Sequence, residues 1–171
     1  TQLIDAGAVG INLEDGSGAP ERLCAKIEAV RKSAVRRDVD LFINARTDVY
    51  LRELATGEAA VQEVVRRARA YREAGCDCLF VPGLADSGQI AAVAKAIQPL
   101  PLNLMLVPRL PGDDVLRQLG VRRLSAGAAI AKAILGRVQQ LASAFLAGAR
   151  EELFVTPIEY GAMNGLLVRS D

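Results

Sequence analysis

The chain has 171 residues, about the length of one domain, and its 51% hydrophobic and 24% charged residues exclude an intrinsically disordered protein. Its 21 Lys and Arg residues against 20 Asp and Glu leave a net charge of +1, which provides no long-range attraction to nucleic acid or to an anionic membrane. The chain contains no His, so Ser/His/Asp triads, Cys/His dyads and His-containing zinc sites are excluded.

The chain starts without Met, in residues 1–6 that are typical of the end of a helix, and we therefore expect an N-terminal part to precede it. A short apolar run followed by an amphipathic helix then occurs five times. The predicted strands are residues 9–15, 41–48, 78–83, 102–108 and 123–127. Their apolar residues do not alternate strictly with polar ones, which indicates strands buried on both faces of a parallel sheet.

Helices are predicted after each of these strands. They cover residues 21–35, 60–74, 87–97, 113–119 and 128–146. In the second, the spacing of Val61, Val64 and Ala68 defines a buried face. The remaining surface of that helix is interpreted as solvated, and it carries Arg66, Arg67 and Arg69. Residues 151–156 are predicted to be irregular and 158–168 to form a last helix, which gives a domain over residues 1–150 and a tail over 151–171.

The cysteines and the hydropathy pattern indicate a cytoplasmic protein. The chain has three cysteines, Cys24, Cys76 and Cys78, and this small, odd number does not indicate a disulfide framework. Charged residues or Pro interrupt every apolar stretch well before the ~18 residues that a membrane-spanning helix needs. We expect no membrane and no nucleic acid among the partners.

Five consecutive βα units are compatible with an open doubly wound sheet or with part of a (βα)8 barrel. The dinucleotide-binding pattern G-x-G-x-x-G and the phosphate-binding pattern G-x-x-x-x-G-K-[ST] do not occur in the sequence. In both architectures, ligands bind at the carboxyl ends of the strands. The periodicity alone leaves the two architectures open.

Polar side chains are concentrated at these predicted strand ends. They are Asn12, Glu14, Asp15, Asn44, Arg46, Thr47, Asp48, Asn103 and Ser125. Charged groups at the ends of apolar strands are costly unless they are paired or bind a ligand. This rim is the candidate site, although a purely structural ion pair of Arg46 with Glu14 or Asp48 also satisfies the pattern.

Several segments resemble the isocitrate lyase/phosphoenolpyruvate mutase superfamily. They read GINLEDG at 10–16, INARTD at 43–48, AGCDCLFVP at 74–82, PLNLM at 101–105 and GVRRLSAG at 120–127. The resemblance extends to about residue 146. It implies an α/β fold, a (βα)8 TIM-type barrel, of which this chain holds the last five βα units, strands four to eight. The first three strands, which carry most of the family's metal ligands, are absent from it.

The resemblance also implies roles for the rim. Glu14 matches the acid that holds Mg2+ (or Mn2+) through water, and Asp15 is a weaker metal candidate. Arg46 matches the arginine that clamps a substrate carboxylate or phosphonate, and a guanidinium fork suits a carboxylate because it binds both oxygens. Asp48 and Asn44 are expected to orient Arg46 or the substrate. A further polar contact to the substrate is expected from Asn103.

The sequence also departs from the family pattern. Where the lyases carry a Lys-Lys-Cys-Gly-His loop with the catalytic Cys, residues 16–22 read GSGAPER. Cys24 lies nearby but within a predicted helix, and we interpret it as structural. On the third predicted strand, the Glu of the lyases and the His of the mutases are replaced by Pro82 and Gly83. On the fourth, the family's hydroxyl residue two places after Asn103 is replaced by Met105.

These observations predict a Mg2+-dependent lyase-like enzyme that cleaves a C–C or P–C bond of a small 2-keto or 2-hydroxy carboxylic acid through an enolate. Two alternatives stay open. One is an oxaloacetate-type decarboxylase of the same superfamily, which needs no acid at the position of the Cys loop. The other is a catalytically inactive barrel fragment or structural subunit. By the resemblance, the protein is expected to form a homo-oligomer, a dimer or tetramer, in which residues 158–168 exchange between subunits.

Overall fold

Five parallel strands form one sheet in the order in which they occur along the chain. They are β1 (Gly10–Glu14), β2 (Phe42–Arg46), β3 (Cys78–Val81), β4 (Leu102–Met105) and β5 (Val121–Ser125). This computed structural model describes residues 2–168. The predicted order and parallel direction of the strands are confirmed, and no antiparallel pair occurs within the described residues.

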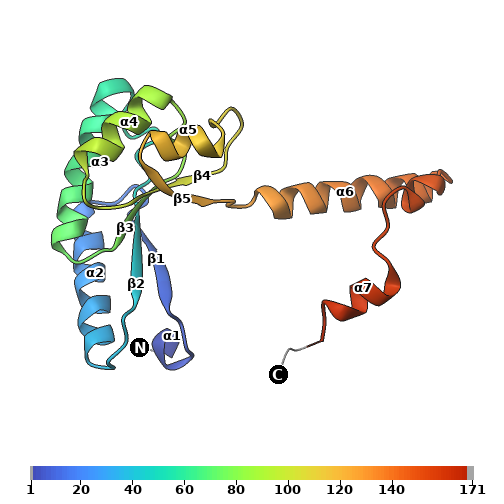
Figure 1. The fold of residues 1–171 in the computed structure, drawn as a ribbon, viewed down its shortest axis with the longest axis horizontal. Helices are drawn as coiled ribbons and strands as arrows, with labels where there is room; N and C mark the ends of the chain where they lie inside the picture. The colour runs from blue at the N-terminus through green and yellow to red at the C-terminus, as the bar shows by residue number, and fades with distance from the viewer. Residues whose placement is uncertain (1, 169–171) are drawn as a thin grey trace. The chain divides into compact units, whose positions relative to one another are not determined.

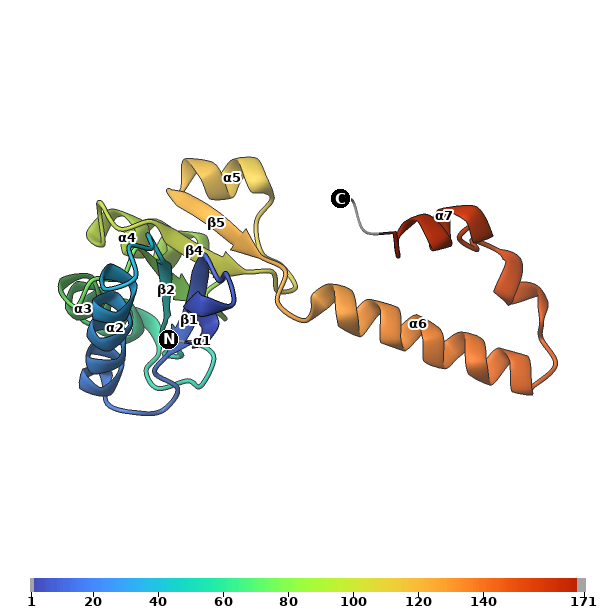
Figure 2. The ribbon, with the colours of Figure 1, turned by 90° about the horizontal axis from the view of Figure 1, so that it is seen from below.

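Helices connect successive strands. They are α2 (Pro20–Val35), α3 (Gly57–Glu73), α4 (Ser87–Ala96) and α5 (Asp113–Gln118), and a short helix, α1 (Gln2–Asp5), precedes β1. In Figures 1 and 2, α2, α3 and α4 lie along the same side of the sheet. This single layer of crossover helices over a parallel sheet is the arrangement of a (βα)8 barrel wall.

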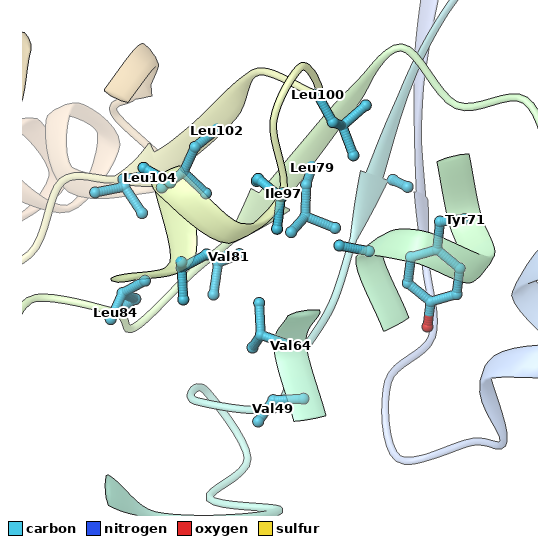
Figure 3. Packing of buried hydrophobic residues seen from close by; sticks show 14 of the residues in the cluster. Val49, Val64, Tyr71, Leu79, Val81, Leu84, Ile97, Leu100, Leu102 and Leu104 are labelled. Carbon is cyan, nitrogen blue, oxygen red and sulfur yellow. The ribbon is translucent and has the colours of Figure 1, made fainter. Parts of the chain in front are cut away.

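The core lies between the sheet and these helices. Its side chains alternate along the strands and recur with helical spacing, so that Ile43 and Leu79 lie in one cluster with Ile27 of α2 and Val64 of α3, all four fully buried. Figure 3 shows part of this cluster, with Tyr71 among the aliphatic side chains. Burying each such aliphatic side chain contributes about 1.5–3 kcal/mol, so this layer is the main source of stability of the sheet.

The other face of the sheet differs from the prediction that both faces are buried. In β1 and β5 the residues that point away from the helices are largely exposed, including Asn12, Glu14 and Arg123. The central strand β3 is buried throughout. The difference arises because, within the described residues, no layer of the first unit covers this face, where Phe42 is also 42% exposed.

The predicted strands extend beyond the observed ones by up to three residues at their carboxyl ends. After β2, the N–H of Thr47 still bonds to the carbonyl of Phe80 at 2.9 Å, but the chain then turns away from the ladder. After β3, Gly83 has a positive φ of 89°, a conformation that ends an extended strand. The last strand begins at Val121, two residues before its predicted start.

The chain divides into two compact units, one up to Gly127 and one from Ala128. The second unit contains α6 (Ala129–Leu146), the 3-10 helix η1 (Glu151–Phe154) and α7 (Tyr160–Gly165). The predicted helix over 158–168 is thus shorter, and residues 169–171 lie outside the described residues. The division falls before the predicted boundary at residue 150, and α6 by itself has no buried residues. Among the described helices, none has the length and hydropathy to cross a membrane.

Candidate active site

An arginine and a glutamate meet at the carboxyl ends of the first two strands. Arg46 ends β2, and Glu14 ends β1 directly opposite it in the sheet register. Their side chains form an ion pair, with Arg46 Nη1 3.1 Å from Glu14 Oε2. The prediction that the two residues emerge at the same end of the sheet is confirmed.

Asp48 holds the other edge of the Arg46 guanidinium. Arg46 Nε donates to Asp48 Oδ1 at 2.7 Å, and Nη2 donates to Oδ2 at 3.3 Å. The carboxylate of Asp48 is fully buried, and its Oδ2 also accepts from Nε of Arg52 at 3.0 Å. Burial alone raises the pKa of Asp48, but the hydrogen bonds from the two guanidinium groups outweigh burial and hold that pKa below its usual value.

The Arg46 guanidinium, which we call the clamp, keeps its positive charge while remaining partly open to solvent. Burial acts to lower the pKa of Arg46, but the hydrogen bond to Asp48 and the nearby carboxylates raise the pKa above its ordinary value. The guanidinium carbon lies 5.9 Å from the centre of the Phe80 ring, within cation–π range. Because 26% of the Arg46 side chain is exposed, a permanently charged and oriented guanidinium is available to an anionic ligand.

Two asparagines on the same face carry buried atoms that have no hydrogen-bond partner among residues 2–168. Asn44 donates through Nδ2 to Oδ1 of Asn12 at 2.9 Å, while its own Oδ1 has no partner. Asn103 accepts through Oδ1 from the Ser125 hydroxyl at 3.1 Å, while its Nδ2 has no partner. Since buried polar atoms are nearly always satisfied by protein or water, these two atoms are open to a ligand or to water.

Glu14 and Asp15 point to opposite sides of the sheet. The Glu14 side chain is 55% exposed on the open face, whereas the Asp15 side chain is fully buried on the helix side. Asp15 Oδ2 accepts from Arg67 and Tyr71 of α3, and its Oδ1 accepts from the backbone N–H of Asp48. The structure therefore corrects the expectation that Asp15 is a weak metal ligand beside Glu14, because all its oxygens are engaged away from that edge.

Arg67 is a second correction, since we expected it on a solvated helix face. Its side chain is only 8% exposed and donates to Asp15 at 2.7 Å and to Glu63 at 2.6 Å. The two arginines beside it in the expected solvated set, Arg66 and Arg69, are exposed. A signal was present in the sequence, because Arg67 stands three residues after Val64 and four before Tyr71, on the buried face.

The described residues supply only part of a metal site. Mg2+ prefers carboxylate, carbonyl and water oxygens in octahedral geometry. Glu14 offers a half-exposed carboxylate of that chemistry, but among residues 2–168 no group of three metal-ligating side chains comes together. These residues therefore fit a contact to the water shell of a cation and do not complete its coordination.

None of the three thiols is a reactive group of the rim. Cys24 lies within α2, and burial raises its pKa. Burial also raises the pKa of Cys76 to about 12 and that of Cys78 to about 11. All three thiols are therefore protonated at neutral pH, in agreement with a structural role.

Gly83, which follows β3, stands where the backbone leaves no room for a side chain. A Cβ at Gly83 would lie 3.1 Å from the backbone nitrogen of Leu51, and the residue has a positive φ.

Arg52 and Phe80 were not identified as rim residues from the sequence. Arg52 follows Asp48 at the i,i+4 spacing of an ion pair, whereas the contact of Phe80 with Arg46 depends on strand register.

Comparison with known proteins places this geometry in a family. The sequence model described as phosphoenolpyruvate phosphomutase matches residues 1–146. An uncharacterized protein of Mycobacterium tuberculosis is 38% identical over 123 residues, which cover 69% of this chain and 44% of the relative. An oxaloacetate decarboxylase of Rhodopseudomonas palustris is 32% identical over 160 residues, covering 86% of this chain and 53% of the relative.

Solved structures give the same result. A Burkholderia cenocepacia protein assigned as a phosphonomutase superposes with a TM-score of 0.73 at 40% identity, covering 85% of this chain and 60% of that one. A phosphoenolpyruvate phosphomutase of Streptomyces platensis has a TM-score of 0.77 at 16% identity, which shows the shared fold. The chain spans 44% and 53% of the lengths of the two curated relatives above.

Proposed function

The chain belongs to the phosphoenolpyruvate phosphomutase family, and on that premise we propose that it forms the anion-binding half of a carbon–carbon lyase acting on a small 2-keto acid. The observation that carries this proposal is the Arg46 clamp. Its guanidinium is charged, partly exposed and held by the buried carboxylate of Asp48 at the carboxyl edge of the sheet.

Arg46 would bind the carboxylate that stays in the product. A guanidinium forms paired hydrogen bonds with a carboxylate, and each charge-assisted bond is worth about 1.5–3 kcal/mol. The unpartnered Oδ1 of Asn44 and Nδ2 of Asn103 are the groups we propose for polar contacts to the same substrate. Asp48 would act by orienting Arg46, because its own carboxylate is fully buried.

Of the reactions that the resemblance allows, decarboxylation of an oxaloacetate-like acid is the one that these residues support best. The C3–C4 bond breaks, its electron pair forms the enolate of the remaining 2-keto acid, CO2 leaves, and a solvent proton adds to C3. This sequence of steps needs no protein base to deprotonate a hydroxyl group. The rim residues described above include neither a His nor an ionised thiol, and several curated relatives are oxaloacetate decarboxylases.

A bound Mg2+ (or Mn2+) would supply positive charge that stabilises the enolate. Glu14 is the residue we propose to contact the water shell of that cation, since its carboxylate is half-exposed beside Arg46. The remaining ligands would have to come from outside the described residues. C–C cleavage of a 2-hydroxy acid and P–C cleavage of a phosphonate remain the wider class to which this proposal belongs.

We also propose that the protein is cytoplasmic and forms a homo-oligomer. The support is the apolar surface of the second unit, where Leu135, Phe145 and Leu146 are 67%, 53% and 85% exposed. Exposed apolar side chains of this extent favour association. Light scattering on the 171-residue chain should show oligomers or aggregates at micromolar concentration, whereas a sharp monomer peak with cooperative unfolding contradicts the proposal.

The test of the function uses the protein expressed with any segment that precedes Thr1 in its gene. A panel of 2-keto and 2-hydroxy acids is incubated with Mg2+, and products are identified by NMR, which distinguishes CO2 release from other C–C cleavage. Arg46→Ala should abolish turnover, by at least about a hundredfold for the loss of charge-assisted bonds, with the fold intact. The matched control is Arg69→Ala on the exposed face of α3, which should keep full activity.

Two results contradict the proposal. If Arg46→Ala unfolds the protein while activity per folded molecule is unchanged, Arg46 is a structural ion-pair member. If no acid of the panel is turned over or bound, the alternative of a catalytically inactive barrel is correct.

A further inference from the structure

Behind the clamp, α3 and the end of β1 share a buried polar cluster formed by Asp15, Arg67 and Tyr71. Asp15 Oδ2 accepts from Arg67 Nη1 at 2.7 Å and from the Tyr71 hydroxyl at 2.5 Å. The side chains of Asp15 and Arg67 are 0% and 8% exposed, and Tyr71 is fully buried. The cluster lies on the helix side of the sheet, where no substrate can contact it directly.

The cluster is connected to the clamp through one backbone amide. Asp15 Oδ1 accepts from the N–H of Asp48 at 2.9 Å, beyond the point where β2 leaves the strand ladder. Asp48 in turn holds Arg46 through Oδ1 at 2.7 Å. The path therefore runs from helix α3 to a strand-end carboxylate, then to the backbone of Asp48, and finally to the guanidinium.

Each link of this path constrains the next. Arg67 and Tyr71 bind the same oxygen of Asp15, which leaves the other oxygen directed at the Asp48 amide. On the opposite side, Arg67 Nε donates to Oε1 of Glu63 at 2.6 Å. Because the carboxylate of Asp48 is fully buried, a shift of its backbone would move the only group that binds both Nε and Nη2 of Arg46 among the described residues.

We propose that Arg67 and Tyr71 are positioning residues of the anion clamp, acting on Arg46 through Asp15 and Asp48. The inference rests on the proposed function, because it assumes that Arg46 binds the substrate carboxylate. Loosening the cluster should weaken anion binding and raise KM, since Arg46 binds the anion in the ground state as well as in the transition state. The value of kcat should change less.

Tyr71→Phe is the sharpest variant, because it removes one hydroxyl from a fully buried ring and leaves no large cavity. The matched control is Tyr50→Phe, two residues from Asp48, since the buried hydroxyl of Tyr50 has no hydrogen-bond partner in the part of the chain that the structure describes. Arg67→Lys is paired in the same way with Arg31→Lys, because Arg31 of α2 also bonds an aspartate, Asp77, that accepts from a strand N–H.

The probe is oxalate, a planar dianion with the shape and charge of a small enolate acid, titrated calorimetrically into the full-length protein with Mg2+. KM and kcat for oxaloacetate and urea unfolding are measured on the same samples. Tyr71→Phe and Arg67→Lys should weaken oxalate binding and raise KM by about tenfold, as substitutions behind a first layer of ligands commonly do. Tyr50→Phe and Arg31→Lys should leave both values unchanged.

The outcomes separate the two proposals. If Tyr71→Phe lowers the urea midpoint but binds oxalate as tightly as the unmodified protein, the cluster is merely structural and the positioning role is wrong. The same conclusion follows if Tyr50→Phe weakens oxalate binding as much as Tyr71→Phe does. If the unmodified protein neither binds oxalate nor turns over oxaloacetate, the proposed function fails and the positioning role fails with it.

Discussion

The two ends of the sheet are each held by an arginine that reaches from a helix to an aspartate. At the amino end, Arg31 of α2 bonds Asp77 at 2.6 Å, and we name these two residues the amino-end pair. At the carboxyl end, Arg67 of α3 bonds Asp15 at 2.7 Å, and these two form the carboxyl-end pair. In both pairs the aspartate also accepts from the backbone N–H of a neighbouring segment.

The pairs differ in burial and in what surrounds them. The side chains of the amino-end pair are 26% and 37% exposed, and Arg31 also donates to the carbonyls of Leu41 and Gly75. Those of the carboxyl-end pair are 8% and 0% exposed. A buried ion pair is costly to desolvate and is weak evidence for stability, so its use beside the clamp agrees with a positioning role. The same type of arginine–aspartate ion pair is thus partly exposed at the amino end of the sheet and buried beside the clamp at the carboxyl end.

The largest expected effect comes from removing the arginine of each pair. Arg67→Ala leaves the buried Asp15 carboxylate uncompensated and should lower the free energy of unfolding by about 3–5 kcal/mol. Arg31→Ala should cost about 1–2 kcal/mol, because water can reach the partly exposed Asp77 and the freed carbonyls. Urea unfolding of both variants measures the difference, and equal losses would show that burial does not distinguish the pairs.

A smaller effect is expected from Glu63, which belongs to the carboxyl end alone. The hydrogen bond from Arg66 lowers the pKa of Glu63 most, burial opposes it, and Arg67 adds to the lowering, so that the pKa falls from 4.5 to about 2. A lowered pKa in the folded state stabilises the protein above pH 4.5, and this stability is lost as the pH falls toward about 2.

Glu63→Gln tests this contribution. The variant should lose about 1–2 kcal/mol at pH 7, after allowance for solvent screening, and its stability should fall less steeply between pH 4.5 and pH 3. Urea unfolding at several pH values measures both changes. An acid limb as steep as that of the unmodified protein would show that Glu63 is not the group that titrates.

The smallest effect concerns the two buried thiols that flank Asp77. At pH 8, Cys76 and Cys78 should react slowly with iodoacetamide, because burial raises their pKa to about 12 and about 11. Arg31→Lys should speed their modification severalfold by local opening of the amino end, whereas Arg67→Lys should not. Mass spectrometry of the labelled peptides measures the rates. If both variants react equally fast, Arg31 does not protect these thiols by a local contact.

Much of the fold follows from the sequence, because the signals that specify it are local. Apolar runs separated by helices with a buried stripe, as at Val61, Val64 and Ala68, predict a parallel βα repeat with its strands in chain order. Strand ends are less well specified. The predicted strand over 41–48 stops at Arg46, because Asp48 bonds to a side chain and not to the next strand.

Of the site, the sequence predicts the carboxyl edge and the placement of Glu14 beside Arg46, since both end strands in the same register. It does not predict that Asp15 turns toward the helices, although alternation along β1 sends neighbouring residues to opposite faces. The buried position of Arg67 was missed because charge suggested a solvated face, while helical spacing placed it with Tyr71. Long-range hydrogen bonds that span more than fifty residues carry no local signal.

Gly83 has a consequence for how this protein could change over evolutionary time. A new side chain there would press on the backbone of Leu51 at 3.1 Å, in a conformation that L-residues rarely adopt. Any side chain at this position would displace the segment that carries Arg52, the partner of Asp48. The loop around Leu51 would have to be remodelled first, so at Gly83 the order in which changes occur decides whether a larger residue is tolerated.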